Sequence, residues 1–144
     1  MATPLVPVVA VGGVVVGPGP RILVVQRATP PLQGAWSLPG GKVRGGELLT
    51  RAVEREVLEE TGLRVLAGDL VQVVEILRES YHYVIHDYLC TPVDPGATPR
   101  AGDDASAARW VRPSELAALG VRDEVVRVVL RAIGMREACL EDEE

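Results

Sequence analysis

The stretch from Gly41 to Leu63, GKVRGGELLTRAVEREVLEETGL, decides the fold of this 144-residue chain. From Glu47 to Thr61, apolar residues recur at three- and four-residue spacing, which is typical of a helix with one buried face. Gly62 follows the last turn, where a glycine commonly ends a helix. The stretch therefore predicts a glycine-containing loop followed by one amphipathic helix that packs against the rest of the chain.

Three carboxylates share one face of this predicted helix. Glu56, Glu59 and Glu60 stand at positions i, i+3 and i+4, so a helix brings them together. An acidic triplet alone usually marks a solvated face, but like charges this close also suit a hard divalent cation with oxygen ligands. Two neighbouring features favour the second interpretation. Gly40-Gly41 lets a backbone approach a ligand closely, and Arg55 can orient a carboxylate or contact a phosphate.

The same stretch resembles a known family signature, the Nudix box. Trp36–Gly40 is similar to the segment that often precedes that box. The resemblance implies an α/β fold, a Nudix-type α/β/α sandwich whose mixed β-sheet is flanked by helices. It also implies hydrolysis of a phosphoanhydride bond with Mg²⁺ as the cofactor, or Mn²⁺ in its place. The matching residues are Gly41, Glu47, Arg55, Glu56, Val57, Glu59, Glu60, Gly62 and Leu63.

The resemblance also implies a role for each polar residue of the box. Arg55 and Glu47, which we expect to open the helix, resemble the pair that ties the loop to the helix. The resemblance implies that both are catalytic residues, together with the three helical glutamates. The residues that resemble the metal ligands are Gly40, through its carbonyl oxygen, and Glu56, Glu59 and Glu60.

A carboxylate must also accept a proton from the attacking water, and the sequence offers two sources for it. Within the family this base is either a box glutamate or an acid on a later loop. Here the box candidates are Glu56 and Glu60, and the loop candidates are Asp103 and Asp104. The two aspartates fall in the predicted loop Thr91–Asp104, and functional residues concentrate on loops. Both sources remain open at this point.

The remaining sequence predicts a single domain over residues 1–135, followed by an acidic, frayed tail over residues 136–144. Short runs rich in valine, isoleucine and leucine predict strands, and two later segments with helical spacing predict helices. The expected strands are Val8–Val16, Arg21–Arg27, Trp36–Leu38, Arg64–Leu77, Tyr81–Cys90 and Ala107–Val111. The expected later helices are Ser114–Leu119 and Glu124–Ile133.

Few residues are available to hold a nucleoside, because the chain has five aromatic residues and no phenylalanine. A nucleobase would stack on one of the four aromatic rings other than that of Trp110, which we expect in the core. Arg27, at the end of a predicted strand, is a candidate contact for a phosphate or a sugar. The candidate substrate-binding residues are Arg27, Trp36, Tyr81, Asp103 and Asp104.

Composition and charge exclude several classes of partner. The formal net charge is −5, and the tail from Arg136 holds one arginine and five acids, leaving about −1 for the rest. No basic patch favours a nucleic-acid polymer. The apolar run Leu5–Val16 is too short and too interrupted to span a membrane. Cys90 and Cys139 are far apart in the sequence and fit a reduced compartment, so we expect a cytoplasmic protein.

The box specifies the chemistry more closely than the substrate. We expect a small nucleotide, first ADP-ribose or a nucleoside diphosphate sugar, cleaved to a nucleoside monophosphate and a phosphorylated partner. Many members that cleave ADP-ribose carry a proline after the box, and here none occurs between Gly62 and Pro92. The alternatives are a nucleoside triphosphate pyrophosphohydrolase that sanitises the nucleotide pool and a dinucleoside polyphosphate hydrolase. A non-catalytic nucleotide-binding regulator is more remote. Family members are often homodimers, and the N-terminal strands could form the interface.

Overall fold

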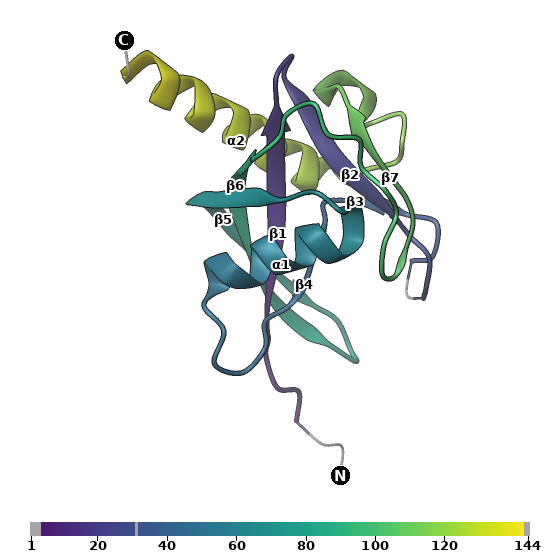
Figure 1. Ribbon diagram of the computed structural model, residues 1–144. Coiled ribbons are helices and arrows are strands. Elements are labelled where there is room, and N and C mark those ends of the chain that lie inside the picture. The colour runs from purple at the N-terminus through teal and green to yellow at the C-terminus, as the bar shows by residue number, and fades with distance from the viewer. Residues whose placement is uncertain (1–3, 31, 143–144) are drawn as a thin grey trace.

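The computed structural model describes residues 4–30 and 32–142 and has three layers, with a β-sheet between two helices (Figure 1). The helical elements are α1 (Leu49–Thr61), a short 3₁₀ helix η1 (Pro113–Glu115) and α2 (Asp123–Asp142). The strands are β1 (Val8–Gly17), β2 (Arg21–Arg27), β3 (Trp36–Ser37), β4 (Gly40–Lys42), β5 (Val65–Leu77), β6 (His82–Pro92) and β7 (Ala105–Val111). The predicted α/β sandwich is confirmed.

The sheet is mixed and is organised around β1. This strand runs parallel to β6 and antiparallel to β2 and β4. On one side β2 continues the sheet to β3 and β7, and on the other side β6 continues it to β5, all antiparallel. The β1–β2 pair forms the hairpin that the sequence predicted. The short strand β4 was not predicted, and it places the beginning of the box directly against β1.

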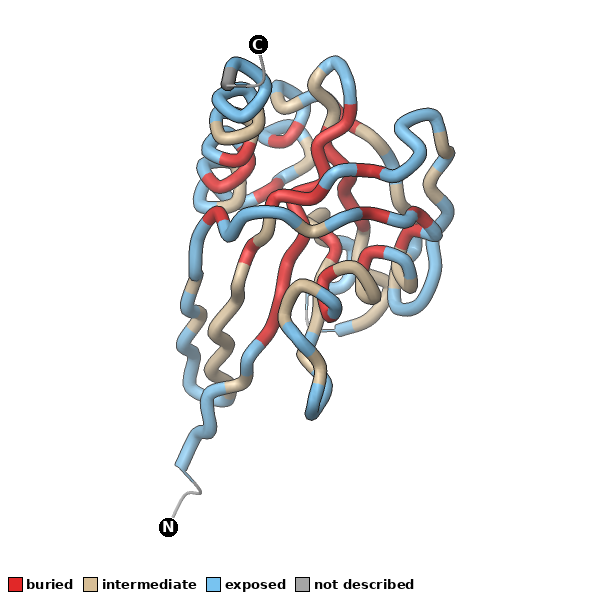
Figure 2. Tube along the Cα trace, turned by 60° about the vertical axis from the view of Figure 1, so that its left-hand side comes forward, coloured by how far each residue is buried: buried red, intermediate tan, exposed pale blue. Residues whose placement is uncertain are grey.

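Two hydrophobic clusters, one on each face of the sheet, hold the layers together. Successive residues of a strand point to opposite faces, so β1 contributes to both clusters. Figure 2 shows this buried material along the middle of the molecule, whereas much of the β5–β6 hairpin is intermediate or exposed. The α1-side cluster includes Val11, Val15, Ala52, Val53 and Val57. The α2-side cluster includes Val14, Val16, Val128, Val129 and Ala132.

Helix α1 begins two residues later than the sequence predicted. Glu47 does not open the helix, because its carboxylate accepts a hydrogen bond from the backbone N–H of Arg44 at 3.1 Å. Leu48 is still extended, with φ −68° and ψ 147°, and the helix starts at the next residue. The end of the helix is as predicted, since Gly62 is left-handed with φ 75° and donates its N–H to Leu58.

The C-terminal elements differ more from the prediction. A helix over Ser114–Leu119 was wrong, because only Pro113–Glu115 forms a 3₁₀ helix before turns that end at the left-handed Gly120. Helix α2 continues past Ile133 to Asp142, so the expectation of a frayed tail is wrong as far as Asp142. Ile133 and Met135 pack against the core and no proline interrupts the helix. Within the described residues, no helix is both long and apolar enough to cross a membrane.

Candidate active site

Two glycines let the box loop lie between β1 and α1. Gly40 pairs with Gly12 in the β1–β4 ladder, and any side chain at position 40 would collide with the carbonyl oxygen of Val11. A Cβ at Gly41 would lie 2.6 Å from the carboxyl carbon of Glu56. The absence of both side chains therefore allows the helix carboxylates to approach the loop backbone.

Arg55 joins the loop to the helix through hydrogen bonds to residues of both. Its Nε and Nη2 donate to the two carboxylate oxygens of Glu47 at 2.8 and 2.9 Å, a bidentate pair. Its Nη1 donates to Glu56 at 2.8 Å and to Glu59 at 3.2 Å, and Nη2 also donates to the carbonyl of Lys42 at 3.1 Å. The hydrogen bond from Arg55 lowers the pKa of Glu47 to about 2. The expected Arg55–Glu47 pair is thus present, together with two further carboxylate contacts.

Glu60 is the carboxyl group of the site whose pKa is raised by its surroundings. Burial raises its pKa to about 8, and the negative charge of Glu56 beside it adds to this effect. The N–H of Gly40 donates a long hydrogen bond of 3.4 Å to its Oε1, and the positive charge of Arg27 also opposes the shift. Glu60 and Glu56 therefore form a close pair of carboxyl groups that lacks enough positive charge to ionise fully.

Glu59 has a different environment from the other two glutamates. Besides the contact with Arg55, its Oε1 accepts a hydrogen bond from Nη2 of Arg44 at 3.4 Å, and this pair is largely exposed. Within the described residues, no three acidic, histidine or cysteine side chains converge as a ready-made metal site. The chemistry of the donors nevertheless fits a divalent cation at Glu56 and Glu60, because a positive charge there would relieve their repulsion. A ligand role for Glu59 or for the Gly40 carbonyl stays a prediction.

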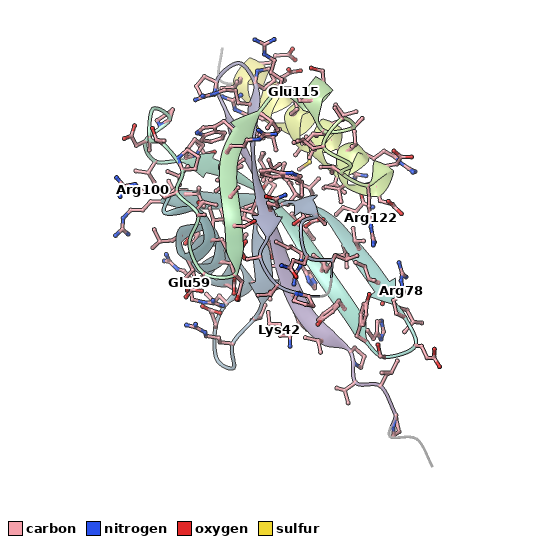
Figure 3. All side chains as sticks on the ribbon, turned by 90° about the vertical axis from the view of Figure 1, so that its right-hand side faces the viewer. Lys42, Glu59, Arg78, Arg100, Glu115 and Arg122 are labelled. Atoms are coloured by element: carbon pink, nitrogen blue, oxygen red, sulfur yellow. The ribbon has the colours of Figure 1, made fainter. Side chains whose placement is uncertain are left out.

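The segment from residue 100 to residue 104 caps the C-terminal end of α1. Backbone N–H groups of Arg100, Gly102 and Asp103 donate to the carbonyls of residues 61, 60 and 59 at 2.8, 2.9 and 3.1 Å. Figure 3 labels Glu59 and Arg100 on the same side of the molecule. Asp104 is left-handed, with φ 57°, a conformation that costs free energy in a residue other than glycine. The structure thus brings both loop aspartates next to the box, with their side chains exposed.

Replacing Gly102 by alanine should test this packing. A Cβ at position 102 would collide with the carbonyl oxygen of Glu59, so the loop must leave the helix end. We expect the melting temperature to fall by about 5 °C or more, since the backbone hydrogen bonds between this loop and the end of α1 are lost. The control is Gly96→Ala in the preceding loop, where the nearest atom to the new Cβ is 3.6 Å away. Equal melting temperatures for the two variants would show that the loop does not depend on this contact.

The other candidate substrate contacts are only partly brought together. The charge of Arg27 acts on Glu60, which places it at the site. Trp36 lies one strand further along the sheet, with the Arg109 guanidinium 4.7 Å from its ring centroid. Tyr81 lies before β6 in the β5–β6 turn, where it packs on Tyr83 with ring centroids 5.3 Å apart. The structure gives Tyr81 no contact with the box.

Two residues near the box were missed by the sequence analysis. Arg44 was not considered as a site residue. The available signal was its position in the sequence, since it is a basic residue between the loop glycines and the acidic helix. Asp87 was treated as part of an ordinary strand, yet it is 7% exposed and burial raises its pKa to about 6. An aspartate inside a run of apolar strand residues was the available signal, because such residues are rare in strand interiors.

The comparison with known families decides the identity of the fold. Residues 6–131 match the NUDIX domain. The chain belongs to the Nudix family. Nudix hydrolases act on phosphoanhydride bonds and typically depend on a divalent metal, so the predicted class of enzyme is confirmed. A solved structure, the MutT protein of Methanosarcina mazei, has the same fold, with a TM-score of 0.77 and 21% identity over 94% of this chain and 99% of that one.

Relatives of this Nudix chain carry different names. The MutT-like protein of Streptomyces ambofaciens is 34% identical over 75% of this chain and 66% of its own length. The ADP-ribose pyrophosphatase of Methanocaldococcus jannaschii is 35% identical over 83% of this chain and 70% of its own length. A Bacillus subtilis protein, provisionally named 8-oxo-dGTP diphosphatase, is 31% identical over 72% and 65%. The chain thus spans about two thirds of each of these relatives. Two of the three names give a substrate, and the two substrates differ.

Proposed function

We propose that this chain hydrolyses the phosphoanhydride bond of a nucleoside diphosphate derivative, giving a nucleoside monophosphate and a phosphorylated partner. The observation that carries the proposal is the Glu56–Glu60 pair beside the glycine loop. Two carboxyl groups held this close, one with its pKa raised to about 8, form a site that a cation would complete. A solvated acidic face would not need the five hydrogen bonds through which Arg55 orders its neighbours.

Each polar group of the chain has a distinct task in this proposal. When bound, a divalent cation neutralises the diphosphate and lowers the pKa of an attacking water. Glu56 and Glu60 would hold that cation, and Glu59 would join them. Arg55 and Glu47 keep the loop and the helix in register, and Arg27 contacts a phosphate oxygen. The base is a carboxylate of the box or one of the loop aspartates, Asp103 and Asp104, which the helix end positions.

The leading substrates are ADP-ribose and nucleoside diphosphate sugars. The relative named ADP-ribose pyrophosphatase supports this choice, because it matches over 83% of this chain. The second candidate is a nucleoside triphosphate such as an oxidised guanine nucleotide, which the name of the Bacillus subtilis relative supports. Both reactions use the same box chemistry, so the distinction lies in the residues that hold the nucleoside.

A substrate panel tests the proposal. The purified chain is incubated with ADP-ribose, nucleoside diphosphate sugars, dinucleoside polyphosphates and nucleoside triphosphates, with Mg²⁺ and separately with excess chelator. We expect one class to give a nucleoside monophosphate, identified by mass, and we expect the chelator to abolish the reaction. Turnover that is the same with chelator would contradict the assigned roles of the glutamates. Nucleotide binding without turnover of any class would instead favour the regulator.

A further inference from the structure

The side chain of Asp87 is buried without a partner. It lies in the middle of β6 with 7% of its surface exposed, and within the described residues no group donates a hydrogen bond to it. Burial raises its pKa to about 6, which leaves the carboxyl group ionised at neutral pH. Buried carboxylates are normally paired or hydrogen-bonded, because an unpaired one is costly. Among the described residues, the fully enclosed polar side-chain atoms without a partner do not include its oxygens, so a molecule from solvent can reach this carboxylate and pair with it.

The position of Asp87 relates it to the box. Asp87 pairs with Gly12 across the β1–β6 ladder, and its Oδ1 occupies the space that a side chain at Gly12 would need. The next residues on the same faces of these strands, Leu89 and Val14, belong to the α2-side cluster. On its other edge Gly12 pairs with Gly40. The carboxylate thus lies on the α2 side of the sheet, and β1 is the one strand between it and β4, where the box starts.

Apolar side chains share this face of the sheet. Trp36 and Leu38 are partly buried against the α2-side cluster. Pro39 follows these two residues and precedes the box. Its carbonyl accepts a hydrogen bond of 2.8 Å from the N–H of Gly13 on β1. Sites for small molecules typically combine apolar walls with a few polar groups that fix orientation. The α2 side of the sheet therefore offers both elements. Gly12 links Asp87 to the box, because it pairs with Gly40, whose N–H donates to Glu60.

We propose that Asp87 selects the nucleobase of the substrate by accepting hydrogen bonds from two adjacent N–H donors. The inference rests on the proposed function, since it needs the diphosphate at the box. An ionised carboxylate has acceptors only. Guanine presents two adjacent donors, its ring N1–H and its amino group, and can meet both oxygens.

The other bases fit the carboxylate less well. Adenine and cytosine present one donor next to an acceptor, and uracil and thymine present one donor between two acceptors. In each case a carboxylate oxygen faces a lone pair, which is unfavourable in a buried site. Asp87 therefore favours guanine nucleotides, oxidised or not, over adenine nucleotides. Among the proposed substrates, this selects guanosine diphosphate sugars and the oxidised guanine nucleotide over ADP-ribose.

Equilibrium binding of GMP and AMP to the full chain tests this inference without turnover. We expect GMP to bind at least about ten times more tightly than AMP, the effect of one hydrogen bond to a charged group. In Asp87→Asn the affinity for GMP should fall by about 10- to 100-fold. The affinity for AMP should not fall, because the asparagine amide offers the acceptor and the donor that adenine matches. The control Asp69→Asn makes the same change at an exposed residue of β5 and should keep the preference.

Thermal unfolding separates this role from a structural one. The pKa of Asp87 is about 6 in the folded protein against 3.8 ordinarily, so the fold binds the proton more tightly than the unfolded chain does. Ionisation destabilises the fold increasingly from pH 3.8 to pH 6, and the full cost is present at pH 7. Asp87→Asn should therefore raise the melting temperature at pH 7, by roughly 3 °C. A lower melting temperature would indicate a structural role and overturn the inference.

The binding data also separate the inference from the proposed function. A wild-type chain that binds GMP no better than AMP, or binds neither, overturns the inference, and so does an Asp87→Asn variant that keeps the GMP preference. A preference for GMP that is lost in Asp87→Asn supports it even if no substrate of the panel is hydrolysed. In that last case only the proposed hydrolysis fails.

Discussion

Replacing Glu60 by glutamine is expected to lower kcat by about 100- to 1,000-fold while the protein stays folded. Glutamine keeps the shape of the side chain and can still accept the hydrogen bond from Gly40 N–H. It removes the negative charge that would hold a cation next to Glu56. The loss should therefore appear in the chemical step, with a smaller change in the affinity for the nucleotide product.

Stability should change in the opposite direction. The pKa of Glu60 is about 8 in the fold against 4.5 ordinarily, so its ionisation destabilises the cation-free protein increasingly between pH 4.5 and pH 8. Without divalent metal at pH 8, Glu60→Gln should melt at the wild-type temperature or above it. Added Mg²⁺ should raise the melting temperature of the wild type by mass action, and that of the variant much less.

The control for this experiment is Glu79→Gln, because Glu79 is exposed in the turn between β5 and β6. This variant should keep both the activity and the response to Mg²⁺. Full activity in Glu60→Gln, or an unchanged response to Mg²⁺, would contradict the role assigned to Glu60. A variant that melts far below the wild type would mean instead that the fold needs the carboxyl group itself.

The helix of the box was predictable because its information is local. Ala52, Val53 and Val57 have helical spacing in the sequence, and all three are buried against the sheet. The pairing of Arg55 with Glu47 also followed from the box, since both residues stand at fixed positions in it. Local spacing and one family signature therefore predicted the helix, its acidic face and the class of reaction.

Other parts of the site depend on contacts between distant segments. The loop at Gly102 packs on the end of α1, about forty residues earlier, and nothing in its local sequence identifies that partner. The burial of Asp87 depends on the strand order, which places Gly12 beside it. The start of α1 was misplaced because the carboxylate of Glu47 binds loop donors instead of belonging to the first turn. Features of this kind can be predicted only when the tertiary arrangement of the chain is known.

The second large effect is expected from replacing Arg55 by alanine. The side chain is 16% exposed and is the shared donor for Glu47, Glu56 and Glu59. Its removal leaves three neighbouring carboxylates to repel one another and leaves the carbonyl of Lys42 without this donor. We expect the melting temperature at pH 7 to fall by more than about 5 °C. We also expect kcat to fall by about 100-fold, because the glutamates lose their fixed positions.

Arg55→Lys distinguishes charge from geometry at this position. Lysine restores one positive charge but cannot make the two parallel hydrogen bonds to Glu47 while also reaching Glu56. It should therefore recover part of the melting temperature and little of the activity. The control is Arg51→Ala on the same helix, whose side chain is 74% exposed and makes one 3.3 Å contact with Glu54, so its effect should be near zero. If lysine restored full activity, the charge of Arg55 alone would suffice, and the fork of hydrogen bonds that joins loop to helix would be dispensable for catalysis.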